Sequence, residues 1–379
     1  MPTNTAAWMG TKYAQLEVGP APYTAPAHDQ IVVRNGAVAV NPLDWIIQVA
    51  GPVAYRWLSY PAVIGSDVAG EVVEVGSSVT RFRVGDRVLG HAVGTDKDSN
   101  SAAEGAFQEY TVVLERMASP IPDPLSYESA CVLPLALSTA ACGLFQSDQL
   151  ALAHPSAGAA RTGETVLVWG GSTSVGSNAI QLAVAAGYDV ITTASPHNHD
   201  YVTALGADRV FDYNSPTVVA DIIDAFRDRT LAGALALGTT SATSCADIVR
   251  SCTGRKFVSI ASTPVSFDGL AGEDRARFAL PRLLLKLVSA KVSLQLRTRP
   301  RGVGTRFIFG TSLKTNEVST AIYQDFLPAA LAEGRYVAAP EPSVVGHSLR
   351  DVQHALDVQR KGVSAQKIVV SVSPSSSQE

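Results

Sequence analysis

Thr165-Val-Leu-Val-Trp-Gly-Gly-Ser-Thr-Ser-Val-Gly176 decides the fold of this chain, together with the segment that follows it as far as Gly187. Val166 to Trp169 is an unbroken apolar, β-prone run, typical of a parallel strand that is buried on both faces. Glycines then turn the chain, and apolar residues recur at helical spacing until Gly187 ends the segment. The stretch therefore predicts a strand, a tight turn and a helix whose first N–H groups can bind a pyrophosphate.

The segments after this unit help to distinguish a nucleotide-binding turn from an ordinary strand–helix turn. Strands and short helices alternate as far as residue 261, with strands expected at 190–194, 209–212, 234–237 and 257–261. Such alternation indicates a doubly wound parallel sheet of the α/β class, in which ligands bind at the carboxyl ends of the strands. The glycine turn lies at such an end. We therefore predict that the dinucleotide is bound by Gly170, Gly171, Ser172, Thr173, Ser174, Val175 and Gly176.

The end of the second predicted strand, Ala194-Ser-Pro-His-Asn198, bears on which dinucleotide binds. Sheets that bind NAD usually carry an acidic residue here, because a carboxylate accepts a hydrogen bond from the ribose 2′-hydroxyl. This segment has none. Ser195 and Asn198 can donate hydrogen bonds to a 2′-phosphate, and His197 adds positive charge when it is protonated. We therefore expect NADPH, although the same residues can also cap the following helix.

Composition argues against several classes of function. The chain has 379 residues, of which 46% are hydrophobic and 17% charged, enough for two globular domains. A net charge of −4 and the lack of basic runs argue against nucleic acid as a partner. No signal-like N-terminus or long apolar run is visible, so we expect a cytoplasmic protein that does not bind membranes. The four cysteines are scattered, which suits a reducing compartment.

The first third of the chain, as far as about Pro124, is rich in β-prone segments and turns. Strands are expected at 31–34, 37–40, 72–75, 87–89 and 109–113. Glycines punctuate these segments, and they mark bends where a closing sheet turns a corner. The pattern predicts a small, curved, barrel-like domain. Beyond Tyr127 we expect an apolar helix interrupted by Pro134, so the domain boundary is placed near residue 125.

Four further motifs precede the glycine turn: Asn41-Pro-x-Asp-Trp45, Pro61-x-x-x-Gly-Ser-Asp-x-Ala-Gly70, Phe82-x-x-Gly-Asp-Arg-Val88 and Gly105-Ala-Phe-x-Glu-Tyr110. Together with the turn they resemble the medium-chain dehydrogenase/reductase superfamily over nearly the whole chain. Within it the chain resembles the zinc-independent quinone oxidoreductase and enoyl reductase branch, particularly the fungal stand-alone (trans-acting) enoyl reductases. The resemblance implies a GroES-like β-barrel domain at 1–125 with a C-terminal return at 336–379, and a Rossmann NADPH-binding domain at 126–335.

The resemblance also implies which residues contact the cofactor. Asn41, Pro42 and Asp44 are expected beside the nicotinamide, and Thr139 near its carboxamide. The other implied contacts lie near the adenosine ribose, at the strand end beneath the nicotinamide and in the closing segment of the chain: Tyr213, Ile260, Ala261, Val363, Ser364 and Lys367. Lys367 could equally be an exposed cation. Thr173 stands where many relatives have glycine.

The superfamily includes zinc alcohol dehydrogenases, so the metal needs its own expectation. Catalytic zinc needs three protein ligands drawn from Cys, His and acidic residues. Where the zinc-type pattern has Gly-His-Glu, this chain has Gly65-Ser-Asp67, and no cysteine precedes Cys131. We therefore expect no metal. The individual histidines, among them His91, are expected at the surface or in packing rather than as ligands.

Without a metal to polarise an alcohol oxygen, the expected reaction is hydride transfer to an acceptor that is already electrophilic. A polarised C=C bond of an enone or enoyl thioester fits, with a proton supplied by a tyrosine or by water. Tyr55 lies roughly where some enoyl reductases keep a proton-donor tyrosine, but it can equally be a packed loop aromatic. Ile46 stands where many relatives have lysine. The alternatives are a zinc-free quinone or carbonyl reductase, and a non-catalytic NADPH-binding modulator of a biosynthetic partner.

The last third of the chain offers candidates for substrate and partner contacts. An apolar helix at 278–288 could line the substrate site or simply pack. The run Arg297-Thr-Arg-Pro-Arg301 could bind the phosphopantetheine phosphate of a carrier-bound substrate, or could be a solvated charge run. Phe307-Ile-Phe309 is expected as the edge strand of the sheet. The expected substrate is a free or carrier-bound α,β-unsaturated intermediate of secondary metabolism, a biosynthetic synthase is a candidate partner, and monomer and homodimer both remain open.

Overall fold

The computed structural model describes residues 2–267 and 273–372, apart from the side chains of residues 52, 53 and 273–280. The chain divides into two compact units, each assembled from segments that are distant in sequence. Unit 1 comprises Met1–Leu135, Phe267–Arg277 and Tyr323–Glu379, and unit 2 comprises Ala136–Ser266 and Phe278–Ile322. The first segment of unit 1 thus ends later than residue 125, because the helix at 127–130 packs on strands of unit 1. The return also begins earlier than residue 336.

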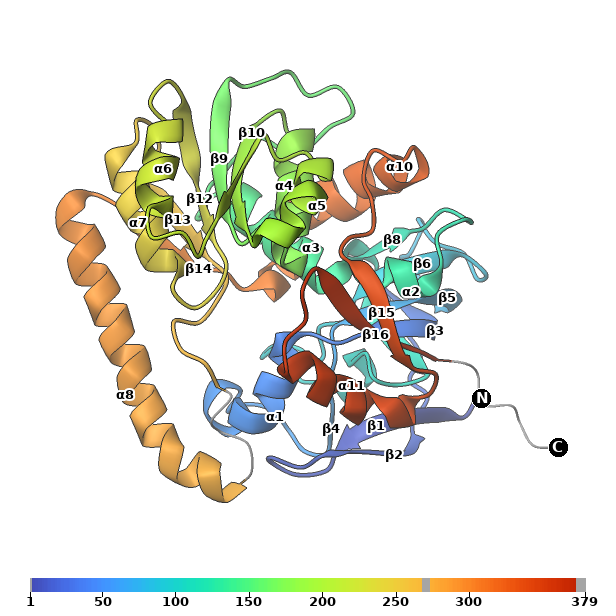
Figure 1. Ribbon diagram of the computed structural model, residues 1–379. Helices are drawn as coiled ribbons and strands as arrows, with labels where there is room; N and C mark the ends of the chain where they lie inside the picture. Colours follow the sequence, from blue (N-terminus) through green and yellow to red (C-terminus); the bar gives the residue numbers. More distant parts are fainter. Residues whose placement is uncertain (1, 268–272, 373–379) are drawn as a thin grey trace. The chain divides into compact units, whose positions relative to one another are not determined.

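Unit 2 is built on a six-stranded parallel sheet in the order β11-β10-β9-β12-β13-β14 (Figure 1). The chain steps outward from β9 first in one direction and then in the other, which is the doubly wound α/β architecture that the sequence predicts. The fold class is therefore confirmed. The edge strand expected at Phe307-Ile-Phe309 is β14, whose residue range begins and ends earlier in the sequence than predicted. The strands are β9 (Glu164–Trp169), β10 (Asp189–Ala194), β11 (Arg209–Asp212), β12 (Thr230–Ala236), β13 (Phe257–Ile260) and β14 (Gly304–Phe307).

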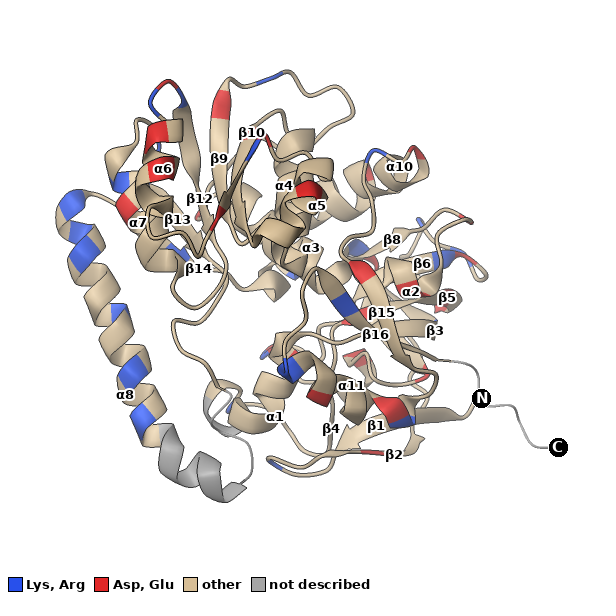
Figure 2. Cartoon of the chain, viewed as in Figure 1, with Lys and Arg blue, Asp and Glu red and all other residues tan. Residues whose placement is uncertain are grey.

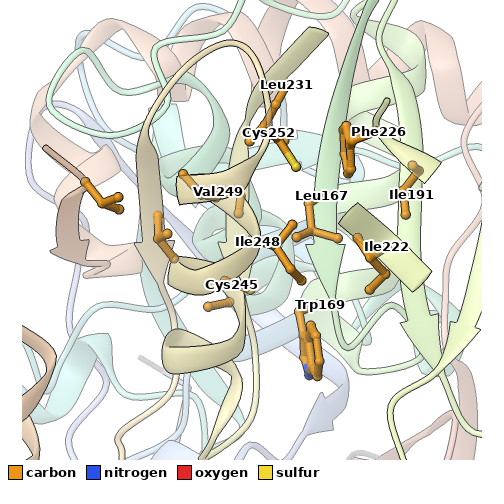
Figure 3. Packing of buried hydrophobic residues seen from close by; sticks show 14 of the residues in the cluster. Leu167, Trp169, Ile191, Ile222, Phe226, Leu231, Cys245, Ile248, Val249 and Cys252 are labelled. Atoms are coloured by element: carbon orange, nitrogen blue, oxygen red, sulfur yellow. The ribbon is translucent and has the colours of Figure 1, made fainter. Parts of the chain in front are cut away.

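A hydrophobic core forms between this sheet and two helices, α6 (Val218–Ala225) and α7 (Ser241–Ser251). Leu167 of β9 meets Ile222 of α6 and Ile248 of α7, and all three side chains are fully buried (Figure 3). Burying a side chain of this size contributes about 1.5–3 kcal/mol. The packing holds β9 in place, and with it the start of the glycine turn.

Two helices differ from the sequence-based expectation. The apolar stretch after residue 126 forms two helices, α2 (Tyr127–Ala130) and α3 (Pro134–Phe145), because proline is tolerated in the first turn of a helix but not in its interior. This stretch is long and apolar enough to cross a membrane, but 78% of its apolar window is buried within the protein, as in a core helix. Helix α8 (Glu273–Thr298) is longer than the helix expected at 278–288 and contains Pro281.

Unit 1 is mainly antiparallel. Its larger sheet has the order β15-β16-β3-β5-β6-β8, with β7 also paired to β3, and its smaller sheet has the order β2-β1-β4. The strands are β1 (Asn4–Met9), β2 (Leu16–Ala21), β3 (Gln30–Ala39), β4 (Ala62–Val63), β5 (Asp67–Val75), β6 (Arg87–His91), β7 (Tyr110–Leu114), β8 (Ala118–Pro120), β15 (Glu341–Gly346) and β16 (Gln366–Ser371). Its helices include α1 (Pro42–Ala54), α10 (Leu327–Ala332) and α11 (Val352–Arg360).

Strand β3 organises unit 1. The sequence predicts two strands here, but they are one strand whose register against β5 shifts between Asn35 and Ala37. At this bend a Cβ on Gly36 would overlap the Tyr127 ring, so only glycine fits. One edge of β3 pairs with β7 before the bend and with β16 after it. The last strand, β16, therefore pairs with the end of β3, and Asn41 lies two residues beyond that end.

Candidate active site

The glycine turn of unit 2 is shaped by its backbone. Gly170 has a φ of 91°, a left-handed conformation that favours glycine. A Cβ on Gly176 would overlap the Gly170 carbonyl oxygen, so a side chain there would push α4 (Ser174–Ala185) away from the turn. The Gly170 amide donates to Thr193 Oγ1 at 2.9 Å, which ties the turn to β10. The shape of the turn therefore depends on glycine at two positions and on a hydrogen bond to β10.

Thr173 caps the helix, a role that the sequence analysis did not assign. Its hydroxyl donates to the Gly170 carbonyl at 2.8 Å and accepts from the Gly176 amide at 3.0 Å. The signal was available, because threonine directly before a helix is a common N-cap. The first four amides of a helix lack acceptors within it. With Gly176 capped by Thr173, the amides of the half-buried Ser174 and Val175 remain at the helix start, where the helix dipole favours an anion.

At the end of β10, Ser195 and Tyr213 come together. Their hydroxyl oxygens lie 3.1 Å apart, and Tyr213 directly follows β11, the neighbour of β10. His197 is exposed in the same segment. Asn198, in contrast, is only 7% exposed, so a contact from it to a phosphate would require this segment to rearrange. The strand end thus offers two hydroxyls and an imidazole to a ligand.

Three more predicted contacts lie in unit 2. Ile260 ends β13, and Ala261 continues the strand by donating its amide to the Ala236 carbonyl at 3.0 Å. Because all strands of the sheet are parallel, these residues lie at the same carboxyl edge as the glycine turn. Thr139 lies in α3 and is partly exposed next to Gly310.

A charged network is buried in unit 1. Lys367 Nζ lies 2.8 Å from Asp67 Oδ2 and also donates to Asn41 Oδ1. Asn41 Nδ2 donates to the same Asp67 oxygen at 2.8 Å, and the Leu135 amide donates to Asp67 Oδ1 at 2.6 Å. Lys367 is 3% exposed and Asp67 is fully buried. Each charge is therefore paired and hydrogen-bonded, as burial requires, and the alternative that Lys367 is an exposed cation is wrong.

Asp44 joins this network through the start of α1. Asn41 is the N-cap of the helix, Pro42 is its first residue, and Asp44 Oδ2 accepts from the Asn41 amide at 2.7 Å. Asp44 Oδ1 is buried and has no hydrogen-bond partner among the described residues. Burial raises the pKa of Asp44 to about 7, the Asn41 amide opposes this shift, and the charge of Asp67 adds to it. The structure thus joins Lys367, which the sequence analysis had placed in the closing segment, to Asn41 and Asp44.

Asp67 and His91 belong to this region but were not predicted as functional residues. They are paired in register across β5 and β6, and both are fully buried. Burial lowers the pKa of His91 to about 4, although the charges of Asp67 and Asp96 act in the opposite direction. A signal for Asp67 existed in the sequence, since a carboxylate at the head of the apolar run Val68-Ala-Gly70 needs a buried partner. The partner itself could not be read from the sequence, because Lys367 lies at the other end of the chain.

Tyr55 follows α1 and is half-buried beside Trp57, with the ring centroids 5.2 Å apart. Burial raises the pKa of the Tyr55 hydroxyl, and the charges of Asp44 and Asp96 raise it further. The phenol therefore stays protonated and can act as a donor. The contact with Trp57 is also what a packed loop aromatic would make, so the local geometry fits both interpretations of this residue.

The closing segment places its predicted residues in two environments. Val363 and Ser364 are exposed in the turn before β16, next to Gly362, which has a φ of 90°. Lys367, at the second position of β16, points into the buried network. Only the first two side chains can therefore contact a ligand directly, while Lys367 acts on Asn41 and Asp67.

The buried network does not fit a zinc ion. A catalytic zinc site uses three protein ligands and an open position. Here both carboxylate oxygens of Asp67 already accept hydrogen bonds, and an ammonium group lies 2.8 Å from one of them. Within the described part of the chain, no three His, Cys, Asp or Glu side chains gather closely enough to hold a metal ion. The side chains of Asp67 and Lys367 therefore form an ion pair where a zinc site would need open ligands.

Comparisons with known proteins agree with this architecture. Residues 27–123 match the family model of the alcohol dehydrogenase GroES-like domain. The chain is 54% identical over 374 residues to dehydrogenase pigH of Monascus ruber, covering 98% of this chain and 100% of that protein. It is 37% identical over 377 residues to trans-enoyl reductase himH of Aspergillus japonicus, covering 98% of each. Among solved structures, an alcohol dehydrogenase superfamily protein from Novosphingobium aromaticivorans has a TM-score of 0.72 at 24% identity, over 98% of this chain and 100% of that one, which supports the fold.

Proposed function

Because the chain belongs to the medium-chain dehydrogenase/reductase superfamily, with fungal dehydrogenases and trans-enoyl reductases as close relatives, we propose that it uses NADPH to reduce a polarised C=C bond without zinc. The substrate we propose is an enone or enoyl thioester intermediate of secondary metabolism. The observation that carries this proposal is the Asp67–Lys367 ion pair. Asp67 ends the Gly65-Ser-Asp67 segment, which stands where the zinc-type pattern has Gly-His-Glu, and its carboxylate is already paired with an ammonium group. A glycine turn that suits a dinucleotide in unit 2, and a carboxylate in unit 1 that is already paired with an ammonium group, support hydride transfer to an acceptor that conjugation has already activated.

Unit 2 supplies the cofactor contacts in this proposal. The amides of Ser174 and Val175 and the dipole of α4 bind the pyrophosphate. Ser195 and Tyr213 donate hydrogen bonds to the 2′-phosphate, and His197 adds charge when protonated. When bound, NADPH supplies the hydride. No acidic residue stands at the end of β10, so no carboxylate of that strand repels the extra phosphate.

Unit 1 supplies the proton in this proposal. Hydride addition at the β-carbon breaks the C=C π bond and leaves negative charge on the enolate, which then takes a proton at the α-carbon. The proposed donor is Tyr55, whose hydroxyl is un-ionised, and the enolate carbon, a much stronger base than a phenolate, takes its proton. Asp44 and Asn41 position the start of α1, the helix after which Tyr55 stands. Tyr55 is therefore the proposed proton donor, and the Asp67–Lys367 pair is a positioning element.

The test is NADPH consumption against a panel of enones, enoyl thioesters, quinones and aldehydes. Cofactor deuterated at C4 should place deuterium on the β-carbon of the reduced enone or thioester. Tyr55→Phe should lower kcat by about 10²-fold or more if the phenol delivers the proton. Tyr13→Phe, which removes a hydroxyl elsewhere in unit 1, should leave kcat unchanged.

Other outcomes would select the alternatives. Turnover of quinones or aldehydes alone would favour the carbonyl or quinone reductase. Tight NADPH binding without turnover of any acceptor would favour the non-catalytic modulator. Stoichiometric zinc in the purified protein, with activity lost to a chelator and restored by zinc, would contradict both the metal assignment and the mechanism.

A further inference from the structure

Helix α8 has two opposite apolar faces. On its inner face Leu294 packs against the core cluster of unit 2, and Thr298 is buried. Away from this face the described part of the helix carries five exposed large apolar side chains, of which Leu285 and Leu296 are 70% exposed. Four of them lie in one line, which we call the outer seam: Leu285, Val288, Val292 and Leu296. The fifth, Leu284, is 41% exposed and flanks this line. A helix that covers a core normally shows one apolar stripe with polar residues opposite, so the packing of α8 on the core of unit 2 does not account for the outer seam.

The spacing of the outer seam is that of a helix-binding surface. Its residues follow one another at intervals of three, four and four positions, so on an α-helix they fall within about 80° of the circumference. At 1.5 Å per residue they span roughly 16 Å along the axis. Such a narrow line of side chains is how one helix presents itself to another, as in coiled coils and helix-in-groove complexes. A second helix is therefore the shape that fits.

Positive charge surrounds the outer seam. From Phe278 to Arg301 the sequence contains no Asp or Glu, although the whole chain has a net charge of −4. Figure 2 shows basic residues along the described part of α8 with no acidic residue among them. At 100° per residue, Arg282 and Lys286 fall on one side of the outer seam and Lys291 on the other. The basic residues of this stretch are Arg282, Lys286, Lys291, Arg297, Arg299 and Arg301, of which Arg297 lies 3.8 Å from Asp247.

We propose that the outer seam docks an acidic amphipathic helix of a partner protein. The apolar side chains of that helix would cover the outer seam, and its Asp and Glu residues would pair with Arg282, Lys286 and Lys291. A second copy of this chain fits poorly, because its own α8 would set the same cations against these. A lipid surface also fits less well, because helices that lie in a membrane interface bury a broad apolar face, whereas the outer seam is a single line of side chains with only Leu284 beside it.

The identity of the partner rests on the proposed function. If the substrate is a thioester on a carrier protein, an acidic helix of that carrier is the occupant, and docking on α8 raises the local concentration of the substrate. The outer seam then contributes binding and no chemistry. Changes in it should raise KM for the carrier-bound substrate and leave the turnover of a free enone unchanged.

The test measures binding of a fluorescently labelled helical peptide of about 20 residues, with Leu at the spacing of the outer seam and Glu on both flanks. We expect saturable binding to the full chain that weakens as salt rises. Val288→Asp/Val292→Asp and Lys286→Glu/Lys291→Glu should each weaken it at least tenfold. The matched controls lie in unit 1: exposed Val84→Asp, and Lys12→Glu/Arg83→Glu, which makes the same charge change. Binding should be unchanged in both controls, and a peptide with Gln in place of Glu should not bind.

Three results would overturn the docking site. The first is peptide binding that neither double variant weakens. The second is tighter binding of phosphatidylglycerol vesicles than of the peptide, lost in the same variants, which would assign the outer seam to a lipid surface. The third is a dimer in light scattering that dissociates in Val288→Asp/Val292→Asp. Absence of free-enone turnover with peptide binding intact would contradict the proposed function and not the docking site.

Discussion

The two units use their polar groups in opposite ways. In unit 2 the glycine turn leaves the amides of Ser174 and Val175 at the start of a helix, where an anion can accept hydrogen bonds from them. In unit 1 Asp67 and Lys367 are buried and satisfy each other together with Asn41. The glycine turn keeps its polar groups available for a ligand. The polar groups of the buried network bond to one another and hold distant segments of the chain together. Damage to the first should therefore appear in ligand binding, and damage to the second in stability.

The largest effect is expected from Lys367→Met. It leaves Asp67 as a buried carboxylate without its cation, and breaking a buried pair from one side typically costs about 3–5 kcal/mol. The free energy of unfolding, measured with urea, should fall by an amount of this order. Lys12→Met, at an exposed lysine of the same unit, should change it by no more than about 0.5 kcal/mol.

A double variant sharpens this comparison. In Lys367→Met/Asp67→Asn the uncompensated charge is removed, so part of the lost stability should return. A double variant as unstable as the sum of the two single variants would mean that Asp67 and Lys367 do not act as a pair. In that case the buried network of unit 1 would not depend on this ion pair, and burial alone would distinguish its polar groups from those of the glycine turn.

The next largest effect is expected from Gly176→Val. Its side chain would overlap the Gly170 carbonyl and displace α4, so NADPH should bind about 10- to 100-fold more weakly, or about 1.4–2.8 kcal/mol. Gly158→Val is the matched control, because a Cβ at Gly158 meets nothing within 4 Å. Equal NADPH dissociation constants in the two variants, measured by calorimetry, would argue against the turn as the pyrophosphate site.

The same contrast explains what the sequence could predict. The strand, turn and helix around Gly170 are encoded within one continuous stretch, by an apolar run, positions that require glycine and helical spacing. The parallel sheet could be predicted as well, because strands and helices alternate in the segments that follow this unit. The order of strands outward from β9 is a general property of such folds.

The network in unit 1 could not be predicted in the same way. Asn41, Asp67 and Lys367 belong to three segments that are far apart in the sequence. Because β3 pairs with β7 before Gly36 and with β16 after it, Lys367 on β16 comes close to Asn41, which follows β3. Nothing local to Lys367 distinguishes an exposed cation from a buried one. The outer seam of α8 was missed for a related reason. An apolar helix was predicted, but which of its faces would be buried depends on contacts outside the helix.

A smaller effect is expected for cofactor choice. NADPH should bind at least tenfold more tightly than NADH, because Ser195 and Tyr213 present hydroxyls and no carboxylate at the end of β10. Ser195→Asp should reduce or reverse this ratio by repelling the 2′-phosphate. Ser156→Asp, at an exposed loop position, should leave the ratio unchanged. Equal affinities for the two dinucleotides in the unaltered protein would remove the role assigned to Ser195.

The smallest effect is expected from pH on the stability of the unaltered protein, because two buried groups of unit 1 change the free energy of unfolding in opposite directions as pH rises. The pKa of His91 is lowered from 6.5 to about 4, so between these values the unfolded chain binds more protons and stability rises with pH. The pKa of Asp44 is raised from 3.8 to about 7, so between these values the native protein binds more protons and stability falls with pH. From about pH 4 to 6.5 the two contributions largely cancel.

Asp44→Asn should expose the contribution that this cancellation hides. Without the carboxyl group, the contribution of His91 is no longer offset, so the free energy of unfolding should rise from pH 4 to 6.5 by up to about 1.4 kcal/mol per pH unit relative to the unaltered protein. The asparagine oxygen can still accept from the Asn41 amide, so the start of α1 is retained. Asp123→Asn, at an exposed position, should leave the pH dependence as it is. Urea unfolding at several pH values measures both slopes. If Asp44→Asn and the unaltered protein gave parallel curves, Asp44 would be ionised in the native state like an ordinary surface carboxylate. The carboxylate of Asp44 would then be accessible to solvent, unlike the fully buried group that the structure shows.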